Sequence, residues 1–299
     1  MIHKLDELKH RLSNLNTQHL VVIQAEDEDV LEAALHAKNE GLVEPIFVGE
    51  SEKIKVLLRE MGSPEVQIIH ADTLEESVDI GFSLVRDKKA DFVMKGLIDT
   101  SVLLKGLLDQ TYGLRTGKLL SHVMIYETPQ YHKLLCVTDG GMNISPNLQQ
   151  KKDILLNAVQ VFRALGYEEI RACGLAAKEK VNPKMEATLD AHALESQLEE
   201  ADLIYEGPLA LDLALSREAA ETKGFNSKVA GEVDILLVPT IEVGNALGKA
   251  MTYVGQAESA GIIMGAKIPV VLTSRADNAT TKLYSIVLGA LIASYMKGE

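Results

Sequence analysis

Cysteine is scarce in this chain of 299 residues, which has two thiols, Cys136 and Cys173. Each thiol lies inside an apolar segment, and the two lack the spacing of a metal-binding or redox pair. We therefore expect both to be buried, structural thiols and expect no bound metal.

Basic residues are in the minority as well, since 30 Lys and Arg face 43 Asp and Glu and give a formal net charge of −13. Such a field repels nucleic acid and anionic membrane surfaces, so any phosphate-bearing ligand must be held by local Arg, Lys and backbone donors. The first residues, MIHKLDELKHRLSNLNTQ, are too polar for a signal peptide, and no apolar stretch reaches the length of a membrane span. We expect a cytoplasmic protein that binds neither nucleic acid nor membrane.

Several nucleotide- and metal-binding motifs are missing from the sequence. GLRTGKL from Gly113 and GNALGKA from Gly244 have three residues between their glycines where the P-loop needs four, and neither lysine is followed by Ser or Thr. The patterns G-x-G-x-x-G after a strand, H-E-x-x-H and G-x-S-x-G do not occur. A P-loop enzyme, a zinc protease and a serine hydrolase therefore have little support, and a nicotinamide dinucleotide enzyme is disfavoured.

What the chain does contain is an alternation of short β-branched runs with longer amphipathic stretches. The expected strands are LVVIQ from Leu20, PIFVG from Pro45, VQIIH from Val66, DFVMKG from Asp91, KLLCVTD from Lys133, IRACGLA from Ile170, DLIYEG from Asp202, DILLVPT from Asp234 and IPVVLTS from Ile268. Helical patterns between them include EDVLEAALHAKNEG from Glu28 and QKKDILLNAVQVFRALG from Gln150. This alternation predicts an α/β protein built on mostly parallel sheet.

Two lobes are expected rather than a row of repeats, because no repeat period or low-complexity linker is visible. The corner TDGGMNISPN is the best point for the chain to leave one lobe, and the approach to Pro269 is the best point to return. We therefore expect a first lobe at residues 1–138 plus 268–299 and a second lobe at 139–267.

The segment PVVLTSRADNATTKLYS from Pro269 places Ser274, Arg275 and Asp277 at a strand-to-helix corner. One interpretation is helix capping by Asp277 or Asn278, with a solvated arginine. The other is an anion site, since a helix N-terminus carries unpaired donors and the positive end of the helix dipole. Both interpretations stay open on this segment alone.

Other strand exits carry groups that suit an anionic ligand. DTSVLLKG begins a helix with hydroxyls that could equally be caps, GLRTGK holds cations in a loop flanked by glycines that could equally be a solvated loop, and PTIEVGNALGKA surrounds Gly244 with polar side chains. The residues that we expect to bind substrate are Lys95, Thr100, Lys105, Arg115, Lys118, Asn143, Glu242 and Asn245.

The chain resembles the phosphate acetyltransferase and phosphate butyryltransferase family from about Asp91 to its end. The resemblance is carried by VMKGLIDTSVLLKGLLD, GLRTGKLLSHV, VTDGGMNISPN, YEGPLALDLALS, VAGEVDILLVPTIEVGNALGKAM and PVVLTSRAD. It is greatest to the butyryltransferase branch, through KGLIDTS and GLRTGK followed by LSHV. The resemblance implies two doubly wound lobes with a cleft between them, similar to isocitrate and isopropylmalate dehydrogenases.

The same resemblance implies direct transfer of a short acyl group between coenzyme A and inorganic phosphate in a ternary complex, with coenzyme A thioester as substrate and no bound cofactor. It gives Arg275 the phosphate and Ser274 the acyl carbonyl. Relatives use an Asp several residues further on as the base for the thiol, and Asp277 is the nearest substitute here because no acid stands near Thr281. Relatives also carry an Arg about where this chain has Lys105.

Three other functions stay open from the sequence. A phosphate acetyltransferase differs only in the acyl group. A metal- and NAD-dependent decarboxylating dehydrogenase would share the two-lobe fold but needs an acidic cluster that the strand exits lack, and a non-catalytic acyl-CoA-sensing module would not need the Ser-Arg pair. We expect a homodimer or a higher homo-oligomer.

Overall fold

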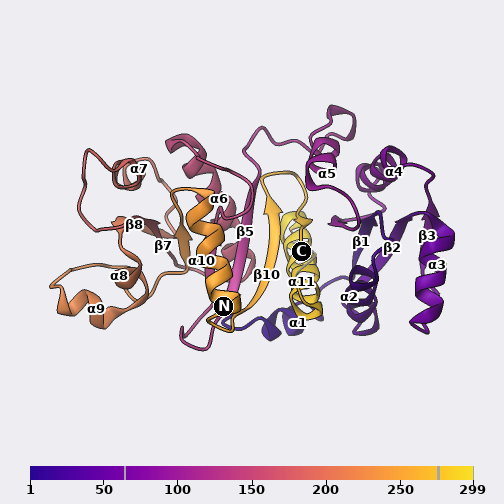
Figure 1. Ribbon diagram of the computed structural model, residues 1–299, viewed down its shortest axis with the longest axis horizontal. Coiled ribbons are helices and arrows are strands. Elements are labelled where there is room, and N and C mark those ends of the chain that lie inside the picture. The colour runs from indigo at the N-terminus through magenta and orange to yellow at the C-terminus, as the bar shows by residue number, and fades with distance from the viewer. Residues whose placement is uncertain (64, 275–276, 299) are drawn as a thin grey trace. The chain divides into compact units, whose positions relative to one another are not determined.

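The computed structural model describes residues 1–63, 65–274 and 277–298, so that Arg275 lies outside the described residues. The chain forms two compact units (Figure 1). The terminal unit comprises Asp6–Lys118 and Ala260–Glu299, and the central unit comprises Met1–Leu5 and Leu119–Ser259.

The terminal unit is built on strands in the order β3-β2-β1-β4-β11-β10, parallel except for β10, which runs antiparallel to β11. The strands are β1 (Gln18–Ile23), β2 (Val43–Gly49), β3 (Gln67–His70), β4 (Phe92–Lys95), β10 (Glu258–Met264) and β11 (Val270–Val271). The helices are α1 (Asp6–Leu12), α2 (Glu28–Asn39), α3 (Ser51–Glu60), α4 (Leu74–Arg86), α5 (Thr100–Leu107), the 3-10 helix η1 (Gln110–Tyr112) and α11 (Ala279–Lys297).

The central unit has strands in the order β5-β6-β9-β7-β8, parallel except for the antiparallel pair β5 and β6. The strands are β5 (Ser121–Glu127), β6 (Leu135–Thr138), β7 (Ile170–Leu175), β8 (Leu203–Leu209) and β9 (Ile235–Leu237). The helices are α6 (Leu148–Ala164), α7 (Glu186–Glu195), α8 (Leu211–Leu215), α9 (Arg217–Thr222) and α10 (Ile241–Tyr253). The expected α/β class with mostly parallel strands is confirmed.

Local sequence explains where several of these helices begin. The Asp27 side chain accepts a hydrogen bond from the Val30 N–H at the start of α2, and Asn147 and Gln150 form a reciprocal capping box at the start of α6. These caps satisfy donors that the first turn of a helix leaves unpaired. Helices α2 and α6 therefore begin within two residues of the starts that the sequence predicted, Glu28 and Gln150.

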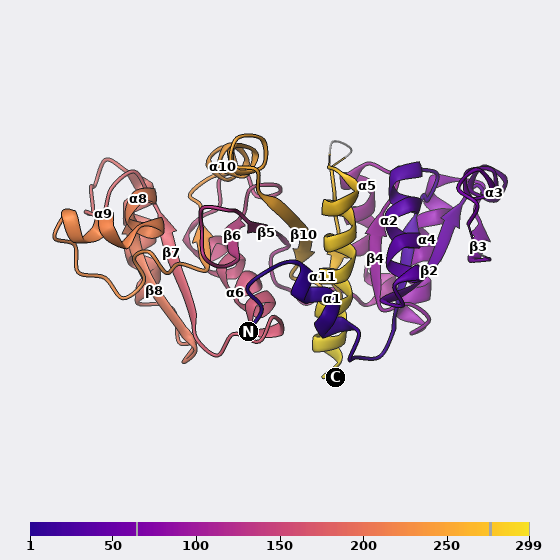
Figure 2. The same ribbon diagram turned by 90° about the horizontal axis from the view of Figure 1, so that it is seen from below.

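Helix α11 is a core helix of the terminal unit. Among the described residues it is the one helix long and apolar enough to cross a membrane, but 78% of its apolar window is buried. It packs beside α1 and α2, and Figure 2 shows α1 and α11 side by side. Its apolar length is therefore used for packing inside this unit.

The unit boundaries differ from the expected lobe boundaries. The chain passes between units at Leu5–Asp6, Lys118–Leu119 and Ser259–Ala260, whereas the expected lobes change at 138–139 and 267–268. The first difference has a physical reason, because β5 and β6 form an antiparallel pair and β6 continues in parallel with β9. Residues 119–138 are thereby bonded into the central unit.

Candidate functional site

The corner that follows β4 is fixed tightly against the end of β1. The Gly96 N–H donates to the Ile23 carbonyl at 2.9 Å, and the Leu97 N–H donates to the Gln24 carbonyl at 2.6 Å. A Cβ atom added at Gly96 would lie 2.0 Å from the Gln24 oxygen, so only glycine fits this close approach. Lys95 is half-buried, and its Nζ donates to the Gly96 carbonyl at 3.3 Å.

Helix α5 starts at this corner, as the sequence predicted. Asp99 is the N-cap residue, but its side chain makes no capping hydrogen bond, and Thr100 is half-buried in the first turn. Lys105 lies exposed in the last turn of the helix. Capping by the Asp99 side chain therefore does not account for the polar residues at this helix start.

The corner that follows β11 lies beside the β4 corner. Strands β1, β4 and β11 are adjacent and parallel, with Val21 opposite Val93 and Val93 opposite Val270. The segments that follow these three strands therefore leave the sheet at one edge, which is the edge where parallel α/β sheets bind ligands. Lys95 ends β4, and Thr100 and Ser274 follow β4 and β11 at that edge.

Ser274 is held by Asp277. The Ser274 N–H donates to Asp277 Oδ2 at 2.7 Å, and the Asp277 N–H donates back to the Ser274 carbonyl at 3.1 Å. The cap of α11 is Asn278, whose Oδ1 accepts from the Thr281 N–H at 2.8 Å. Of the two capping residues that the sequence left open, Asn278 is therefore the one in place, and the Asp277 carboxylate turns back onto the backbone of Ser274.

A buried lysine, Lys282, also holds the backbone of this corner. Lys282 is 2% exposed, and its Nζ donates to the Asp277 carbonyl at 2.7 Å and to Asp29 Oδ2 at 3.0 Å. These bonds connect α11 to α2 and fix the backbone of Asp277. The sequence did not identify Lys282, because its partner Asp29 lies some 250 positions away in the chain.

The loop with Arg115 and Lys118 is tied to a different part of the terminal unit. Arg115 forms a β-bridge with Ala266, and the Thr116 hydroxyl donates to the Gly265 carbonyl. These partners lie in the connection that precedes β11, whereas Ser274 lies in the segment that follows it. Both cations are exposed, so the loop presents them on an anchored backbone.

In the central unit, Asp139 organises the corner that follows β6. Its carboxylate is buried and accepts four hydrogen bonds. Oδ1 accepts from the N–H groups of Gly141 and Met142, each at 2.8 Å, and Oδ2 accepts from the His122 N–H at 3.1 Å and from Asn143 Nδ2 at 2.6 Å. The sequence identified this corner but not Asp139 as its centre.

Asn143, Asn245 and Glu242 were expected to bind substrate from this unit. Asn143 Nδ2 also donates to the Leu120 carbonyl at 2.9 Å, so both of its amide hydrogens are engaged. Asn245 Nδ2 donates to the Gly140 carbonyl at 3.3 Å. Glu242 is exposed, and hydrogen bonds from its own backbone N–H and from the Thr240 hydroxyl lower its pKa.

Two glycines bring the Asp139 corner onto the first turn of α10. A Cβ atom at Gly140 would lie 2.8 Å from the Gly244 carbonyl carbon, and a Cβ atom at Gly244 would lie 2.7 Å from Gly140 Cα. Larger residues would push the corner and the helix apart. Gly244, the first glycine of GNALGKA, therefore serves a close backbone contact, which is consistent with the rejection of a P-loop.

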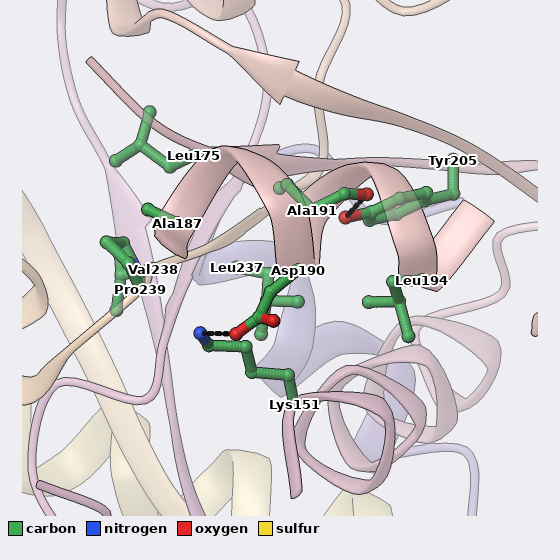
Figure 3. A pocket seen from close by; sticks show the side chains of 11 residues that line it. Lys151, Leu175, Ala187, Asp190, Ala191, Leu194, Tyr205, Leu237, Val238 and Pro239 are labelled. Atoms are coloured by element: carbon green, nitrogen blue, oxygen red, sulfur yellow. Dashed lines mark hydrogen bonds and ion pairs between the residues drawn. The ribbon is translucent and has the colours of Figure 1, made fainter. Parts of the chain in front are cut away.

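A small pocket lies between α6, α7 and the ends of β7 and β9 (Figure 3). Lys151 lines it, and its Nζ lies 2.6 Å from Asp190 Oδ2 (Figure 3). The lysine is 7% exposed and its charge is matched inside the pocket. None of the expected site residues lines this pocket, and its paired lysine makes it a poor anion site.

The sequence also predicted that both cysteines are buried and structural. Cys136 and Cys173 are fully buried, as predicted, and burial raises the pKa of both thiols, which makes them poor nucleophiles. Within residues 1–63, 65–274 and 277–298 there is no group of three His, Cys, Asp or Glu side chains that could hold a metal ion.

Comparison with known proteins gives consistent matches over nearly the whole chain. The family model described as phosphate acetyl/butaryl transferase matches residues 58–290. The chain is 45% identical to a probable phosphate butyryltransferase of Bacillus subtilis over 97% of this chain and 98% of the relative. It is 42% identical to a phosphate acetyltransferase of Thermotoga maritima over 92% and 95% of the two chains.

A solved structure of a branched-chain phosphotransacylase from Enterococcus faecalis is similar in both fold and sequence. It matches with a TM-score of 0.82 and 30% identity, covering 93% of this chain and 99% of that one. A phosphotransacetylase from Streptococcus pyogenes has the same fold, with a TM-score of 0.80 at 24% identity over 96% and 97% of the two chains. These likenesses confirm the fold expected from the sequence, that of isocitrate and isopropylmalate dehydrogenases.

Proposed function

Because the chain belongs to the phosphate acetyl/butaryl transferase family, we propose that it transfers a short acyl group, butyryl in preference to acetyl, between coenzyme A and inorganic phosphate. The observation that carries this proposal is 45% identity, over nearly the full length of both chains, to a relative named a probable phosphate butyryltransferase. The corner formed by Lys95, Thr100 and Ser274 supplies polar groups at the ligand edge of the terminal unit.

The proposed reaction is direct attack of a phosphate oxygen on the thioester carbon in a ternary complex. A carbon–oxygen bond forms, the carbon–sulfur bond breaks, and coenzyme A leaves as a thiolate that takes up a proton. No enzyme nucleophile is needed, so the protein acts by orienting two anionic substrates and by stabilising the charge on the carbonyl oxygen. The buried cysteines have no part in this scheme.

Ser274 is assigned to the acyl carbonyl. Its exposed side chain carries a hydroxyl donor, and the Asp277 carboxylate fixes its backbone at 2.7 Å. A donor held in place before the reaction stabilises the developing oxyanion without reorganisation cost. The phosphate is assigned to Arg275, which lies outside the described residues, on the strength of the family resemblance alone.

Asp277 has two possible uses in this scheme, because a carboxylate has two oxygens. Oδ2 positions Ser274, which leaves Oδ1 as the atom that could take a thiol proton in the reverse direction. A free thiol has a pKa near 8.5 and needs only modest help at neutral pH. Positioning of Ser274 is therefore assigned as the main role of Asp277, with proton transfer second.

The remaining expected residues are proposed to bind the phosphate-bearing groups of the substrates. Lys95 and Thr100 lie at the Ser274 edge, while Arg115 and Lys118 present exposed charges on an anchored loop. Lys105 is exposed at the end of α5 and is proposed as a further point charge for an anion.

From the central unit, Asn143 Oδ1, Glu242 and Asn245 are proposed as polar contacts for coenzyme A. Asn143 is held by Asp139, and Asn245 stands one residue after the glycine that touches Gly140. An ionised Glu242 repels anions, so it is proposed to accept hydrogen bonds from donor groups of the ligand.

The test is a thiol-release assay with acetyl-, propionyl-, butyryl- and isobutyryl-CoA, each with and without phosphate. We expect release that depends on phosphate and is faster with the four-carbon groups. Equal or better use of acetyl-CoA would replace the proposal with a phosphate acetyltransferase, an activity that 42% identity to the Thermotoga maritima enzyme also favours. Release without phosphate would exclude both transferases.

Two assays on the unmodified protein test the remaining alternatives, a dehydrogenase and an acyl-CoA-sensing module. An NAD-dependent dehydrogenase would reduce the nucleotide when given a hydroxy acid and a divalent metal, and we expect no reduction. A sensing module would bind acyl-CoA with no phosphate-dependent release of thiol.

A cytoplasmic location and a homo-oligomeric state are proposed alongside the activity. Burial of α11 supports the location, because the helix long enough to span a membrane is used in the core. Sedimentation velocity at several protein concentrations tests the assembly, and a single species at the chain mass of 32.6 kDa would exclude an oligomer.

A further inference from the structure

Leu97 is an exposed apolar residue at the ligand edge of the terminal unit. It lies in the short segment between β4 and α5 and is 46% exposed, whereas Gly96 before it and Ile98 after it are buried. The residues that flank this segment, Lys95 at the end of β4 and Thr100 at the start of α5, are polar. A leucine in such a place exposes apolar surface to water at an energetic disadvantage unless something covers it.

The backbone of Leu97 is held firmly in place. Its N–H donates to the Gln24 carbonyl at 2.6 Å, and the Ile98 N–H donates to the Gly96 carbonyl at 2.9 Å. Gly96 lies so close to Gln24 that no side chain fits between them. The backbone that carries the Leu97 side chain is therefore fixed, which lowers the entropy cost of using this side chain as a binding contact.

Other large exposed apolar residues of the terminal unit lie elsewhere. Among its described residues these are Val56 in α3, Leu108 after α5 and Tyr295 near the end of α11. None of the three lies in a segment that joins a parallel strand to the helix after it. Leu97 is thus set apart by its position at the strand exits and not by exposure alone.

Leu97 and Ser274 lie in the segments that leave two adjacent parallel strands, β4 and β11. Val271 of β11 is opposite Met94 of β4, and Ser274 and Leu97 each follow three residues after that pair. The two strands are about 4.8 Å apart where they pair, which is close to the reach of a short alkyl chain. A substrate whose carbonyl oxygen meets the Ser274 hydroxyl would therefore direct the alkyl part of its acyl group to the neighbouring position.

We infer that Leu97 is a specificity-determining residue that contacts the alkyl chain of the acyl group and favours four-carbon over two-carbon acyl-CoA. The inference rests on the proposed acyl transfer and on the role of Ser274 in it. Butyryl has two more methylenes than acetyl, and each methylene removed from water is worth about fourfold in an equilibrium constant. Full cover of both would give up to about fifteenfold, and one leucine covers part of them.

The experiment uses the full chain and compares kcat/KM for acetyl-, propionyl- and butyryl-CoA at saturating phosphate. Leu97→Ala removes the apolar contact, Leu97→Asn replaces it by a polar group of similar size, and Leu97→Met keeps an apolar side chain. Leu108→Ala is the matched control, because Leu108 is 43% exposed in the same unit but lies at the far end of α5.

We expect the butyryl-to-acetyl ratio of kcat/KM to fall by about fivefold to tenfold in Leu97→Ala and Leu97→Asn, while acetyl-CoA changes by less than about threefold. Leu97→Met and Leu108→Ala should keep the ratio of the unmodified protein. Melting temperatures should stay within about 2 °C, since the side chain is exposed.

The outcomes separate this inference from the proposed function. If the unmodified protein releases no thiol with phosphate from any acyl-CoA, the proposed transfer is wrong and the role of Leu97 falls with it. If the protein is active but the ratio is unchanged in both Leu97→Ala and Leu97→Asn, the specificity role alone is wrong. An equal loss with all three substrates would also overturn it, because a structural residue affects every acyl group alike.

Discussion

Replacing Asp139 by asparagine tests the hydrogen-bond network at the β6 corner. In the folded protein its buried carboxylate accepts four N–H donors at 2.6 to 3.1 Å. An asparagine has one acceptor oxygen, which can satisfy one pair of donors, and its amide group then faces the other pair. Two bonds to a charged acceptor are lost, and two donors are left without a partner.

The size of the effect follows from these bonds. Hydrogen bonds to a charged group contribute about 1.5 to 3 kcal/mol each, so two lost bonds amount to about 3 to 6 kcal/mol. The variant also avoids the cost of burying a charge, which offsets part of that loss. We expect Asp139→Asn to lower the free energy of unfolding by about 3 kcal/mol.

Urea denaturation followed by circular dichroism measures this change as a lower midpoint with an unchanged slope. Asp153→Asn is the matched control, since Asp153 is an aspartate of the same unit that is partly exposed and accepts one neutral side-chain bond, from Gln149 at 3.2 Å. The control should change stability by less than about 0.5 kcal/mol. A loss as small as the control's in Asp139→Asn would show that the four bonds do not stabilise the corner.

Three further predictions concern other carboxylates. Asp190→Asn leaves the buried ammonium of Lys151 without its partner, so thermal or urea unfolding should show a loss of about 2 to 3 kcal/mol, and no loss would mean that the pair is not formed in solution. The hydrogen bonds from Arg163 lower the pKa of Asp202, so this pair stabilises the fold above the unfolded pKa near 3.9 and its contribution is lost as pH falls through the folded value. Asp202→Asn should therefore lower the free energy of unfolding by about 1 kcal/mol at pH 7, a small effect because both side chains are about one-third exposed. Below about pH 4 the variant and the unmodified protein should be equally stable. A difference in stability that does not depend on pH would contradict this. Asp277→Asn retains an acceptor for the Ser274 N–H, so its kcat should stay within about tenfold of the unmodified protein, and Asp277→Ala should lose more. Equal losses of kcat in both variants, with a flattened pH profile, would instead identify Asp277 as a base.

The sequence predicted nine strands that the structure contains, but it missed β5 and β10. Strand β10 reads ESAGIIM, in which Ser259, Ala260 and Gly261 have low strand propensity, yet all of it except Glu258 is buried. The Gly261 N–H donates to the Ser285 hydroxyl of α11 at 2.9 Å, a contact that needs the folded helix. Tertiary packing, which no local pattern reveals, makes this segment a strand.

Missing β5 had consequences for both the domains and the site. Without β5 there was no reason to bond residues 119–138 to β9, and the expected lobe boundary lies about 20 residues after the unit boundary at Lys118–Leu119. The His122 N–H, which donates to Asp139, lies in the same unpredicted strand. The Asp-Gly-Gly corner was visible in the sequence, but its role as a hub depends on a partner strand that was not.

The corner after β11 shows a different limit. Asp277 and Asn278 are both good N-cap residues, and the sequence could not choose between them. The structure gives the cap to Asn278 because the Asp277 carboxylate is engaged by the Ser274 N–H. That choice depends on side-chain directions at a turn, which residue type and spacing leave undetermined.

Acyl preference is a property that overall similarity resolves poorly, and the energies explain why. Relatives named for butyryl and for acetyl transfer are 45% and 42% identical to this chain, almost the same degree of similarity. The groups that hold phosphate and the thioester carbonyl act on atoms that both substrates share, so they are common to both activities. What differs is two methylenes, worth about 1.6 kcal/mol together, which one or two apolar side chains can supply. Identity averaged over 299 positions cannot register a change of that size. The preference must therefore be sought in the few residues that face the alkyl chain, for which we propose Leu97, an exposed apolar residue in the segment that follows β4.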